Sequence, residues 1–193
     1  MLDNLKKYHI LLGSNSPRRR ELLGGLGIEF EVRVLPDVAE NYPSNLPVDE
    51  IAAYIAREKA AAYLPVIKDD ELVITADTVV IAQGEVMGKP VDAADARRML
   101  RKLSGHRHDV VTGVCLATTQ RQRTFAVKTE VEFKQLTDDE INYYIDTYRP
   151  FDKAGAYGIQ EWIGYVGVTG IEGSYFNVMG FPVQRVYSEL QQF

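Results

Sequence analysis

The stretch Leu72-Val73-Ile74-Thr75-Ala76-Asp77-Thr78-Val79-Val80-Ile81-Ala82 is mostly apolar and carries one charge, that of Asp77. A short apolar run rich in β-branched residues predicts a strand buried inside a sheet. Gln83-Gly84 follows as a predicted turn, and Gly88-Lys89-Pro90 ends the return of the chain. The centre of the fold is therefore expected to be a buried strand that reverses tightly.

Asp77 conflicts with the burial that its neighbours predict. A carboxylate inside a buried strand is costly unless it is paired or binds a metal, so a general base, a metal ligand or a buried ion pair are the expected uses. The alternative is that the strand breaks at Asp77 and the side chain meets water. In a regular strand, Thr78 points to the opposite face.

Helices and strands are mixed along the rest of the chain. In the second predicted helix, an apolar stripe is formed by Ile51, Tyr54, Ile55 and Ala62. Gln120-Arg121-Gln122 predicts a hairpin turn, which requires antiparallel pairing. The class is α/β, with a mixed, twisted sheet flanked by helices. Helices are predicted over residues 16–23, 49–64, 92–103, 137–148 and 182–191, and strands over residues 8–12, 30–34, 72–82, 110–118, 124–133 and 165–168.

Composition limits the function classes. The chain has 193 residues and a net charge of −5, so the broad basic face of a nucleic-acid-binding protein is not expected. An anionic ligand would need a local cluster of positive charge. Neither a signal peptide nor an apolar run of about 18 residues is visible, which predicts no membrane association and a cytoplasmic location. The lone Cys115 is interpreted as a buried apolar residue.

Three consecutive arginines supply such a cluster. Ser16 is a predicted N-cap with Pro17 at the first helical position, so Arg18, Arg19 and Arg20 fall in the first helical turn. Cations there oppose the helix dipole, and the arrangement is favourable if an external anion binds. The alternative is a solvated basic turn. A Walker A phosphate loop is absent from the sequence.

Other candidates are weaker by themselves. Lys59 lies in the second predicted helix and Lys89 in a turn, where lysines usually extend their charge into water. Asp37 and Glu40 occupy a loop that would supply a second carboxylate. His106 and His108 give weak support for a zinc site, because few further ligands accompany them.

Several ordered motifs together resemble the Maf family of nucleoside triphosphate pyrophosphatases, over nearly the whole chain. The motifs are Ser14, Ser16, Pro17, Arg18, Arg19, Glu21, Leu22 and Leu23 of S-x-S-P-R-R-x-E-L-L, then Ala56-Arg57-Glu58-Lys59-Ala60, Ala76-Asp77-Thr78-Val79-Val80, Gly88-Lys89-Pro90, Leu103-Ser104-Gly105-His106 and Asp152-Lys153-Ala154-Gly155-Ala156-Tyr157-Gly158-Ile159-Gln160.

The resemblance implies one Maf-like domain over residues 1–193, with two lobes around a central cleft, often as a homodimer. It also implies hydrolysis of a nucleoside triphosphate to the monophosphate and pyrophosphate, aided by Mg²⁺ or Mn²⁺. Asp77 is implied as the catalytic base and, with Glu40, as a metal contact; the family's usual Asp-Glu pair is Ala39-Glu40 here. The implied substrate-binding residues are Ser14, Arg18, Arg19, Lys59, Thr78, Lys89 and Gln160.

Three of these residues mark a subgroup of the family. Arg18, Thr78 and Gln160 match the type that acts on dTTP and UTP, so the resemblance implies these substrates. Two other functions remain open at this point. One is a pyrophosphatase for modified or non-standard nucleotides, and the other is a non-enzymatic, nucleotide-binding regulator of cell division.

Overall fold

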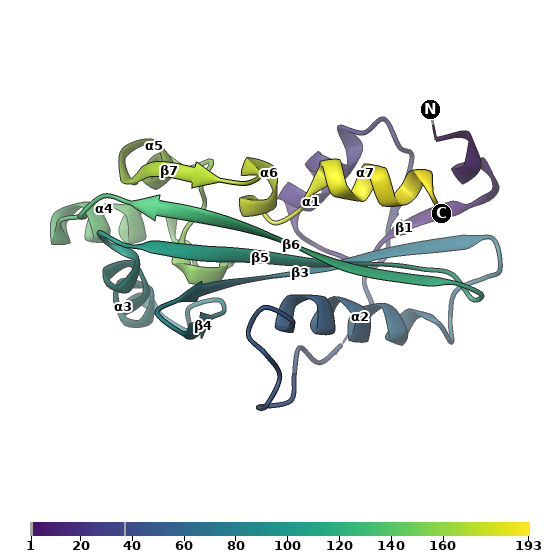
Figure 1. The fold of residues 1–193 in the computed structure, drawn as a ribbon, viewed down its shortest axis with the longest axis horizontal. Helices are drawn as coiled ribbons and strands as arrows, with labels where there is room; N and C mark the ends of the chain where they lie inside the picture. Colours follow the sequence, from purple (N-terminus) through teal and green to yellow (C-terminus); the bar gives the residue numbers. More distant parts are fainter. Residues whose placement is uncertain (1, 37) are drawn as a thin grey trace. The chain divides into compact units, whose positions relative to one another are not determined.

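The structure is a computed structural model that describes residues 2–36 and 38–193, so the candidate Asp37 lies outside the described residues. The described residues form a seven-stranded mixed sheet in the order β2-β1-β3-β5-β6-β7, with β4 paired to β3 (Figure 1). The predicted α/β class is confirmed. The strands are β1 (His9–Leu12), β2 (Glu31–Val32), β3 (Glu71–Ala82), β4 (Glu85–Met87), β5 (Arg107–Ala117), β6 (Gln122–Phe133) and β7 (Val168–Glu172).

Parallel pairing joins β1 to β2 and β3, whereas β3 with β4 and β6 with β7 are antiparallel. The helices follow the predicted pattern in most places, and among the described residues none is long and apolar enough to cross a membrane. They are η1 (Asp3–Lys7), α1 (Pro17–Gly24), α2 (Ile51–Tyr63), α3 (Ala93–Leu103), α4 (Asp138–Tyr148), η2 (Ala154–Ala156), α5 (Trp162–Gly167), α6 (Tyr175–Val178) and α7 (Val183–Gln191).

The chain divides into two compact units, which correspond to the two predicted lobes. The first comprises Met1–Asp77, Thr112–Val127 and Gly180–Phe193, and the second comprises Thr78–Val111 and Lys128–Met179. The boundary passes through β3, between Asp77 and Thr78. The single-domain organisation and the cleft between the lobes stay predictions.

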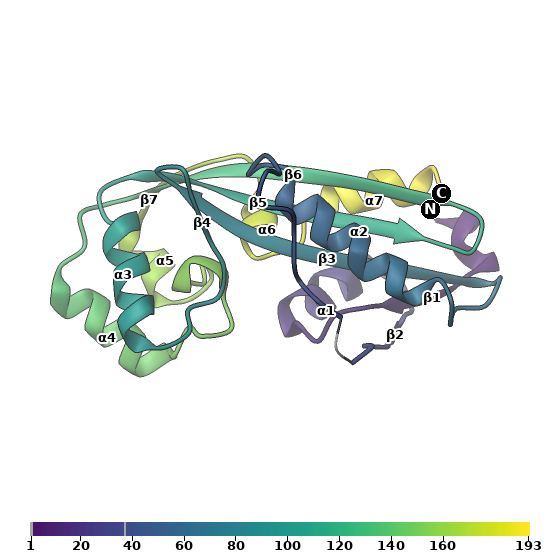
Figure 2. The same cartoon turned by 90° about the horizontal axis from the view of Figure 1, so that it is seen from below.

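In the first unit, helices cover both faces of the sheet: α2 lies on one face, and α1 and α7 lie on the other (Figures 1 and 2). Alternate residues of β1 and β3 enter two different cores, as a period of two requires. Leu11 and Val73 pack with Ala56 and Ala60 of α2. The opposite faces of the same strands pack with α1 and α7 through Leu12, Ile74, Leu23, Val186 and Leu190.

The buried face of α2 differs from the predicted stripe. Ile51 and Ile55 are buried as expected, but Tyr54 and Ala62 are only partly buried. The helix instead buries Ala52, Ala56, Ala60 and Tyr63. Gly113 of β5 explains the difference, because a Cβ there would lie 2.2 Å from the carbonyl carbon and oxygen of Ala52. The small side of α2 therefore faces the sheet, at a distance that only glycine permits.

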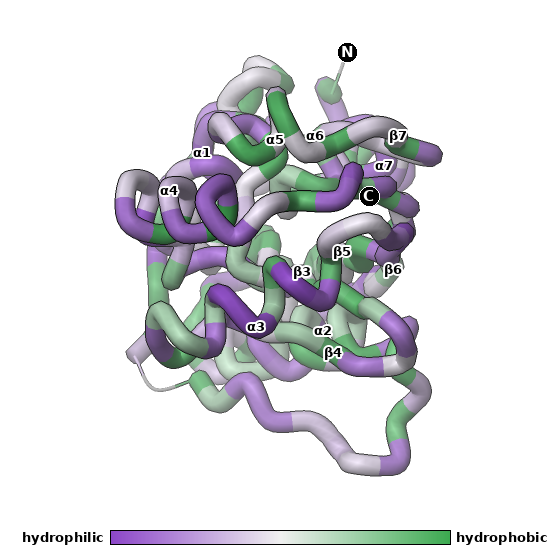
Figure 3. Tube along the Cα trace, turned by 90° about the vertical axis from the view of Figure 1, so that its left-hand side faces the viewer, coloured by the Kyte–Doolittle hydropathy of each residue, from purple (hydrophilic) through white to green (hydrophobic). Residues whose placement is uncertain are grey.

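The second unit has its own core. Helices α3, α4 and α5 lie together on one side of the strands (Figure 2). Polar and apolar residues alternate around α3 and α4, as expected of amphipathic helices (Figure 3). The predicted capping box of Thr137 and Glu140 is present at the start of α4. Leu100, Phe133, Tyr144 and Ile163 are among the side chains that fill this core.

The predicted strand over residues 165–168 is wrong. Residues Trp162–Gly167 form α5, and the strand β7 begins at Val168. The aromatic and β-branched residues of this segment favour a strand locally. Packing decides otherwise, because Gly164 lies so close to the preceding segment that a Cβ there would be 1.8 Å from the carbonyl oxygen of Ile159.

Candidate active site

The start of α1 is built as predicted. Pro17 opens the helix, and the hydroxyl of Ser16 accepts a hydrogen bond from the backbone N–H of Arg19 at 3.4 Å. The hydroxyl of Ser14 accepts from the backbone N–H of Ser16 at 3.2 Å and from Nη1 of Arg19 at 3.4 Å. Ser14 is buried. These hydrogen bonds fix the residues before α1 against the N-terminus of the helix.

Arg19 joins this turn to two other segments of the first unit. Its Nη1 donates to the carbonyl oxygen of Ala76 at 2.8 Å, and its Nε donates to that of Gly180 at 2.9 Å. Burial lowers the pKa of the guanidinium, and the negative charges of Asp77 and Glu40 oppose that shift. Arg20, the third arginine of this turn, has an exposed side chain.

Asp77 lies in an unbroken strand, so the alternative of a break at this residue is wrong. Its carboxylate is 13% exposed and is paired with Lys59, whose Nζ lies 2.8 Å from Oδ1. The same ammonium lies 2.7 Å from Oε1 of Glu40. Lys59 is 14% exposed and extends from α2 into this pair rather than into water.

Two carboxylates therefore converge on one cation, beside an arginine at a helix N-terminus. Among the described residues, no group of three or more histidine, cysteine, aspartate or glutamate side chains forms a candidate metal site. Two carboxylates nevertheless match the usual protein contribution to a Mg²⁺ site, in which substrate phosphates and water supply the other ligands. The carboxylate oxygens of Glu40 and Asp77 are therefore suitable ligands for Mg²⁺.

The remaining predicted residues belong to the second unit. Thr78 continues β3, Lys89 is exposed in the segment after β4, and Gln160 lies in the turn between η2 and α5. The carboxamide oxygen Oε1 of Gln160 is buried and makes no hydrogen bond among the described residues. A buried oxygen in this state can accept a hydrogen bond from a ligand or a water molecule.

Sequence reasoning missed a group of residues around Gln160. Lys153 is buried, and its Nζ lies 3.0 Å from Oε1 of Glu161. The other carboxylate oxygen of Glu161 accepts a hydrogen bond from the hydroxyl of Tyr144. That hydroxyl also accepts from the backbone N–H of Gly158 at 3.0 Å. The available signal was Lys153, a lysine directly before the small, glycine-containing run Ala154-Gly155-Ala156.

The two histidines support no zinc site. His108 is buried, its Nε2 shares a hydrogen bond of 2.7 Å with the hydroxyl of Tyr157, and its ring packs edge-on against Phe133. Burial lowers the pKa of His108 to about 4. His108 is therefore a neutral core residue at physiological pH.

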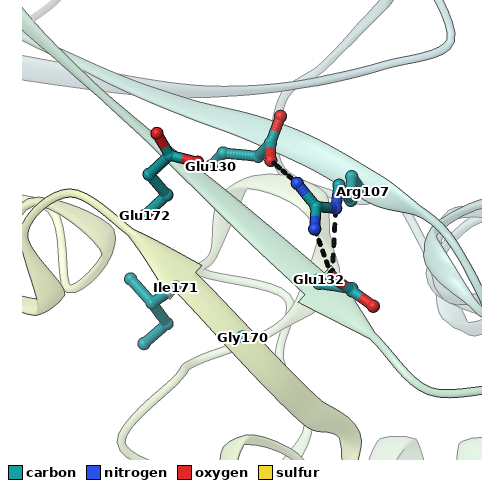
Figure 4. Close-up of a pocket in the computed structure, with 6 residues that line it drawn as sticks. All are labelled: Arg107, Glu130, Glu132, Gly170, Ile171 and Glu172. Carbon is teal, nitrogen blue, oxygen red and sulfur yellow. Dashed lines mark hydrogen bonds and ion pairs between the residues drawn. The ribbon is translucent and has the colours of Figure 1, made fainter.

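None of the predicted site residues lines a hollow in the second unit. Arg107 of β5 pairs with Glu130 and Glu132 of β6 at 2.7 and 3.0 Å, and Glu172 lies opposite Glu130 in the strand register (Figure 4). Gly170 and Ile171 complete its lining. The three carboxylates that line this hollow would repel the negative charge of a triphosphate.

Comparison with known proteins identifies the family. Residues 9–193 match the family described as Maf-like protein. A protein of Phocaeicola vulgatus named dTTP/UTP pyrophosphatase is 62% identical over 100% of both chains. A protein of the same name from Bacteroides fragilis is 58% identical over 100% of both chains. Another, from Flavobacterium johnsoniae, is 46% identical over 97% of this chain and 96% of that one. Among solved structures, a HAM1 protein from Coxiella burnetii matches with a TM-score of 0.49 and 15% identity, covering 96% of this chain and 100% of that chain. The family match over residues 9–193, together with relatives of this identity over their full length, shows that the chain belongs to the Maf family.

Proposed function

We propose that the chain hydrolyses dTTP and UTP to the nucleoside monophosphate and pyrophosphate. The observation that carries the proposal is the arrangement of Lys59, Asp77 and Glu40 beside Arg19 at the start of α1. Cationic groups and a helix N-terminus suit phosphate oxygens, and a carboxylate in a buried strand suits proton transfer. The names of the relatives support the choice of substrates.

In this proposal, the triphosphate is bound by Arg18, Arg19 and the N–H groups at the start of α1, with Ser14 holding Arg19 in place. Lys59 and Lys89 neutralise the β- and γ-phosphates. Thr78 and Gln160 contact the pyrimidine base. Binding therefore combines charge neutralisation at the phosphates with hydrogen bonding at the base.

Asp77 accepts a proton from the attacking water. The water oxygen forms a bond to the α-phosphorus, and the bond from this phosphorus to the bridging oxygen of the β-phosphate breaks. Pyrophosphate leaves with the electron pair of that bond. The lysines stabilise the negative charge that develops on the leaving group.

Glu40 and Asp77 would hold a divalent cation, Mg²⁺ or Mn²⁺, together with phosphate oxygens. When bound, such a cation polarises the α-phosphate and neutralises part of its charge. Lys59 pairs with both carboxylates, so phosphate contacts by its ammonium would compete with these two pairs.

A cytoplasmic location and a homodimer belong to the same proposal. The strand β7 ends the sheet order, and unpaired edges favour association with another strand. Ile171 of β7 and the nearby Phe176 are 41% and 46% exposed, which adds apolar surface close to that edge. Light scattering coupled to size exclusion measures the oligomeric state directly.

A substrate panel tests the function. dTTP, UTP, CTP, GTP and modified triphosphates are incubated with Mg²⁺ or Mn²⁺, and pyrophosphate is measured. Fastest release from dTTP and UTP is expected. Preference for a modified nucleotide would favour a pyrophosphatase of another specificity. Nucleotide binding without turnover would favour a regulatory protein and contradict the proposal.

A further inference from the structure

The turn that carries Gln160 is held by a closed set of hydrogen bonds inside the second unit. The backbone N–H of Glu161 donates to the carbonyl oxygen of Gly158 at 3.0 Å. The N–H of Gly158 donates to the Tyr144 hydroxyl at 3.0 Å, and this hydroxyl donates to the Glu161 carboxylate. Lys153 pairs with the other oxygen of that carboxylate at 3.0 Å. Lys153, Glu161 and Tyr144 are called the clamp below.

Holding the turn with the clamp costs desolvation free energy. The side chains of Lys153 and Glu161 are 9% and 20% exposed, so both charges have lost most of their hydration. Desolvation of a charge pair commonly offsets its attraction, and apolar residues of similar size would often stabilise the fold as well. Tyr144 is fully buried. Burial and the neighbouring Glu161 raise the pKa of its phenol, which keeps the hydroxyl protonated as a donor. What these polar groups supply is directed hydrogen bonds, which fix the geometry of the turn.

Gln160 and two of the clamp residues lie around the same glycine, Gly158. A Cβ added to Gly158 would lie 2.9 Å from Nε2 of Gln160, 2.9 Å from Cε of Lys153 and 3.1 Å from Cδ of Glu161. Gly158 is thus surrounded by the two charged clamp residues and the Gln160 carboxamide. The carboxamide nitrogen therefore lies close to the clamp, while the buried oxygen Oε1 makes no hydrogen bond to the described residues.

Uracil and thymine share an imide edge in which N3–H is a donor between two carbonyl acceptors. Cytosine has an unprotonated N3 acceptor at the same position. A fixed carbonyl oxygen therefore attracts the imide and repels cytosine, and a site built around a hydrogen bond discriminates strongly against a base that cannot make it.

We propose that the clamp orients the Gln160 carboxamide so that Oε1 accepts a hydrogen bond from N3–H of uracil or thymine. The inference rests on the proposed function and adds the mechanism by which the base is selected. Lys153, Glu161 and Tyr144 act as positioning residues, because they hold Gln160 and do not contact the base themselves.

Tyr144→Phe tests the clamp. This variant removes the hydroxyl that joins Gly158 to Glu161 and leaves the ring in the core. Tyr157→Phe is the matched control, since it also removes one buried hydroxyl from the same core, where it bonds His108. We measure kcat and KM for UTP, CTP and N3-methyl-UTP with each purified variant, after circular dichroism has confirmed folding.

The wild type is expected to prefer UTP over both other substrates. In Tyr144→Phe, the UTP-to-CTP ratio of kcat/KM should fall about tenfold, the effect of about one hydrogen bond, mainly through KM for UTP. Tyr157→Phe should keep the wild-type ratio. Gly158→Ala, which crowds Gln160 without removing a clamp residue, should also lower the ratio, whereas Gly170→Ala, with ordinary contacts, should not.

Different failures have different meanings. If Tyr144→Phe or folded Gly158→Ala keeps the wild-type ratio while Gln160→Ala lowers it, the clamp has no positioning role. If N3-methyl-UTP is hydrolysed as well as UTP, Oε1 does not receive N3–H. If the wild type hydrolyses none of the triphosphates, the proposed function itself is wrong. Should Tyr144→Phe fail to fold, Glu161→Gln decides in its place, because it keeps the shape of the side chain and removes the charge that pairs with Lys153.

Discussion

Lys59 Nζ lies 2.8 Å from Oδ1 of Asp77, joining a helix residue to the charged residue in the middle of the buried strand β3. Without this partner, the carboxylate would be an uncompensated buried charge. The same ammonium contacts Glu40, so the Lys59 side chain forms an ion pair with both carboxylates of the candidate active site.

Asp77→Asn keeps the shape of the side chain and removes its ability to accept a proton. We expect kcat for UTP to fall by about 10²–10⁴, the usual contribution of a general base. Nucleotide affinity, measured by calorimetry, should change little. Asp138→Asn is the control, because Asp138 is a surface residue paired with Arg101. Near-normal turnover in Asp77→Asn would remove the assigned role.

Lys59→Met tests whether the lysine competes with a divalent cation. The variant lacks the ammonium that competes with Mn²⁺ for the carboxylates of Glu40 and Asp77. Mn²⁺ should therefore bind about tenfold more tightly in the absence of nucleotide. Hydrolysis should fall, because phosphate neutralisation is lost. Mn²⁺ binding is followed by electron paramagnetic resonance, with Lys128→Met, at a surface pair with Asp109, as control. Weaker Mn²⁺ binding in Lys59→Met would show that the carboxylates do not form the metal site.

Arg19 and Arg20 are neighbours with different expected roles. Arg19→Lys cannot reproduce the bonds to Ala76, Gly180 and Ser14, so we expect a loss of about 1–3 kcal/mol in the free energy of unfolding and a higher KM. Arg20→Ala should leave both near wild type, since Arg20 is exposed. Urea unfolding and steady-state kinetics measure the two effects. A larger rise in KM for Arg20→Ala would reverse the assignment.

His108 predicts a pH dependence of stability. Its pKa is about 4 in the fold and about 6.5 when unfolded, so the unfolded chain binds the proton more readily in between. The contribution of neutral His108 is complete above about pH 6.5 and is lost as the pH falls toward 4. Between pH 7.5 and 5.0 the free energy of unfolding should fall by about 2 kcal/mol more in the wild type than in His108→Gln. Equal losses in both proteins would contradict the buried, neutral state.

Much of the fold could be predicted from the sequence, because apolar patterning and helix capping act between residues that are close along the chain. The apolar run around Asp77 became β3, Ser16 and Pro17 started α1, and Thr137 with Glu140 formed the capping box of α4. Two errors arose where packing overrode these preferences. Gly113 brought the alanine side of α2 to the sheet, and Gly164 fixed a helix where the side chains favour a strand.

Parts of the candidate site could be predicted because their residues oppose the usual preferences of helix starts and buried strands. Arginines at a helix start and a carboxylate in an apolar strand are unfavourable without a partner or ligand, and Arg19 and Asp77 are both part of the observed cluster. The clamp was not visible in this way. Tyr144 is separated from Glu161 by 17 positions, and only the tertiary fold joins them.

The central claim is that water attacks the α-phosphate of UTP and pyrophosphate leaves. Hydrolysis in water enriched in ¹⁸O, followed by mass spectrometry of both products, tests it most directly. We predict one ¹⁸O atom in UMP and none in pyrophosphate. Label in pyrophosphate, or release of labelled orthophosphate with UDP, would contradict the account.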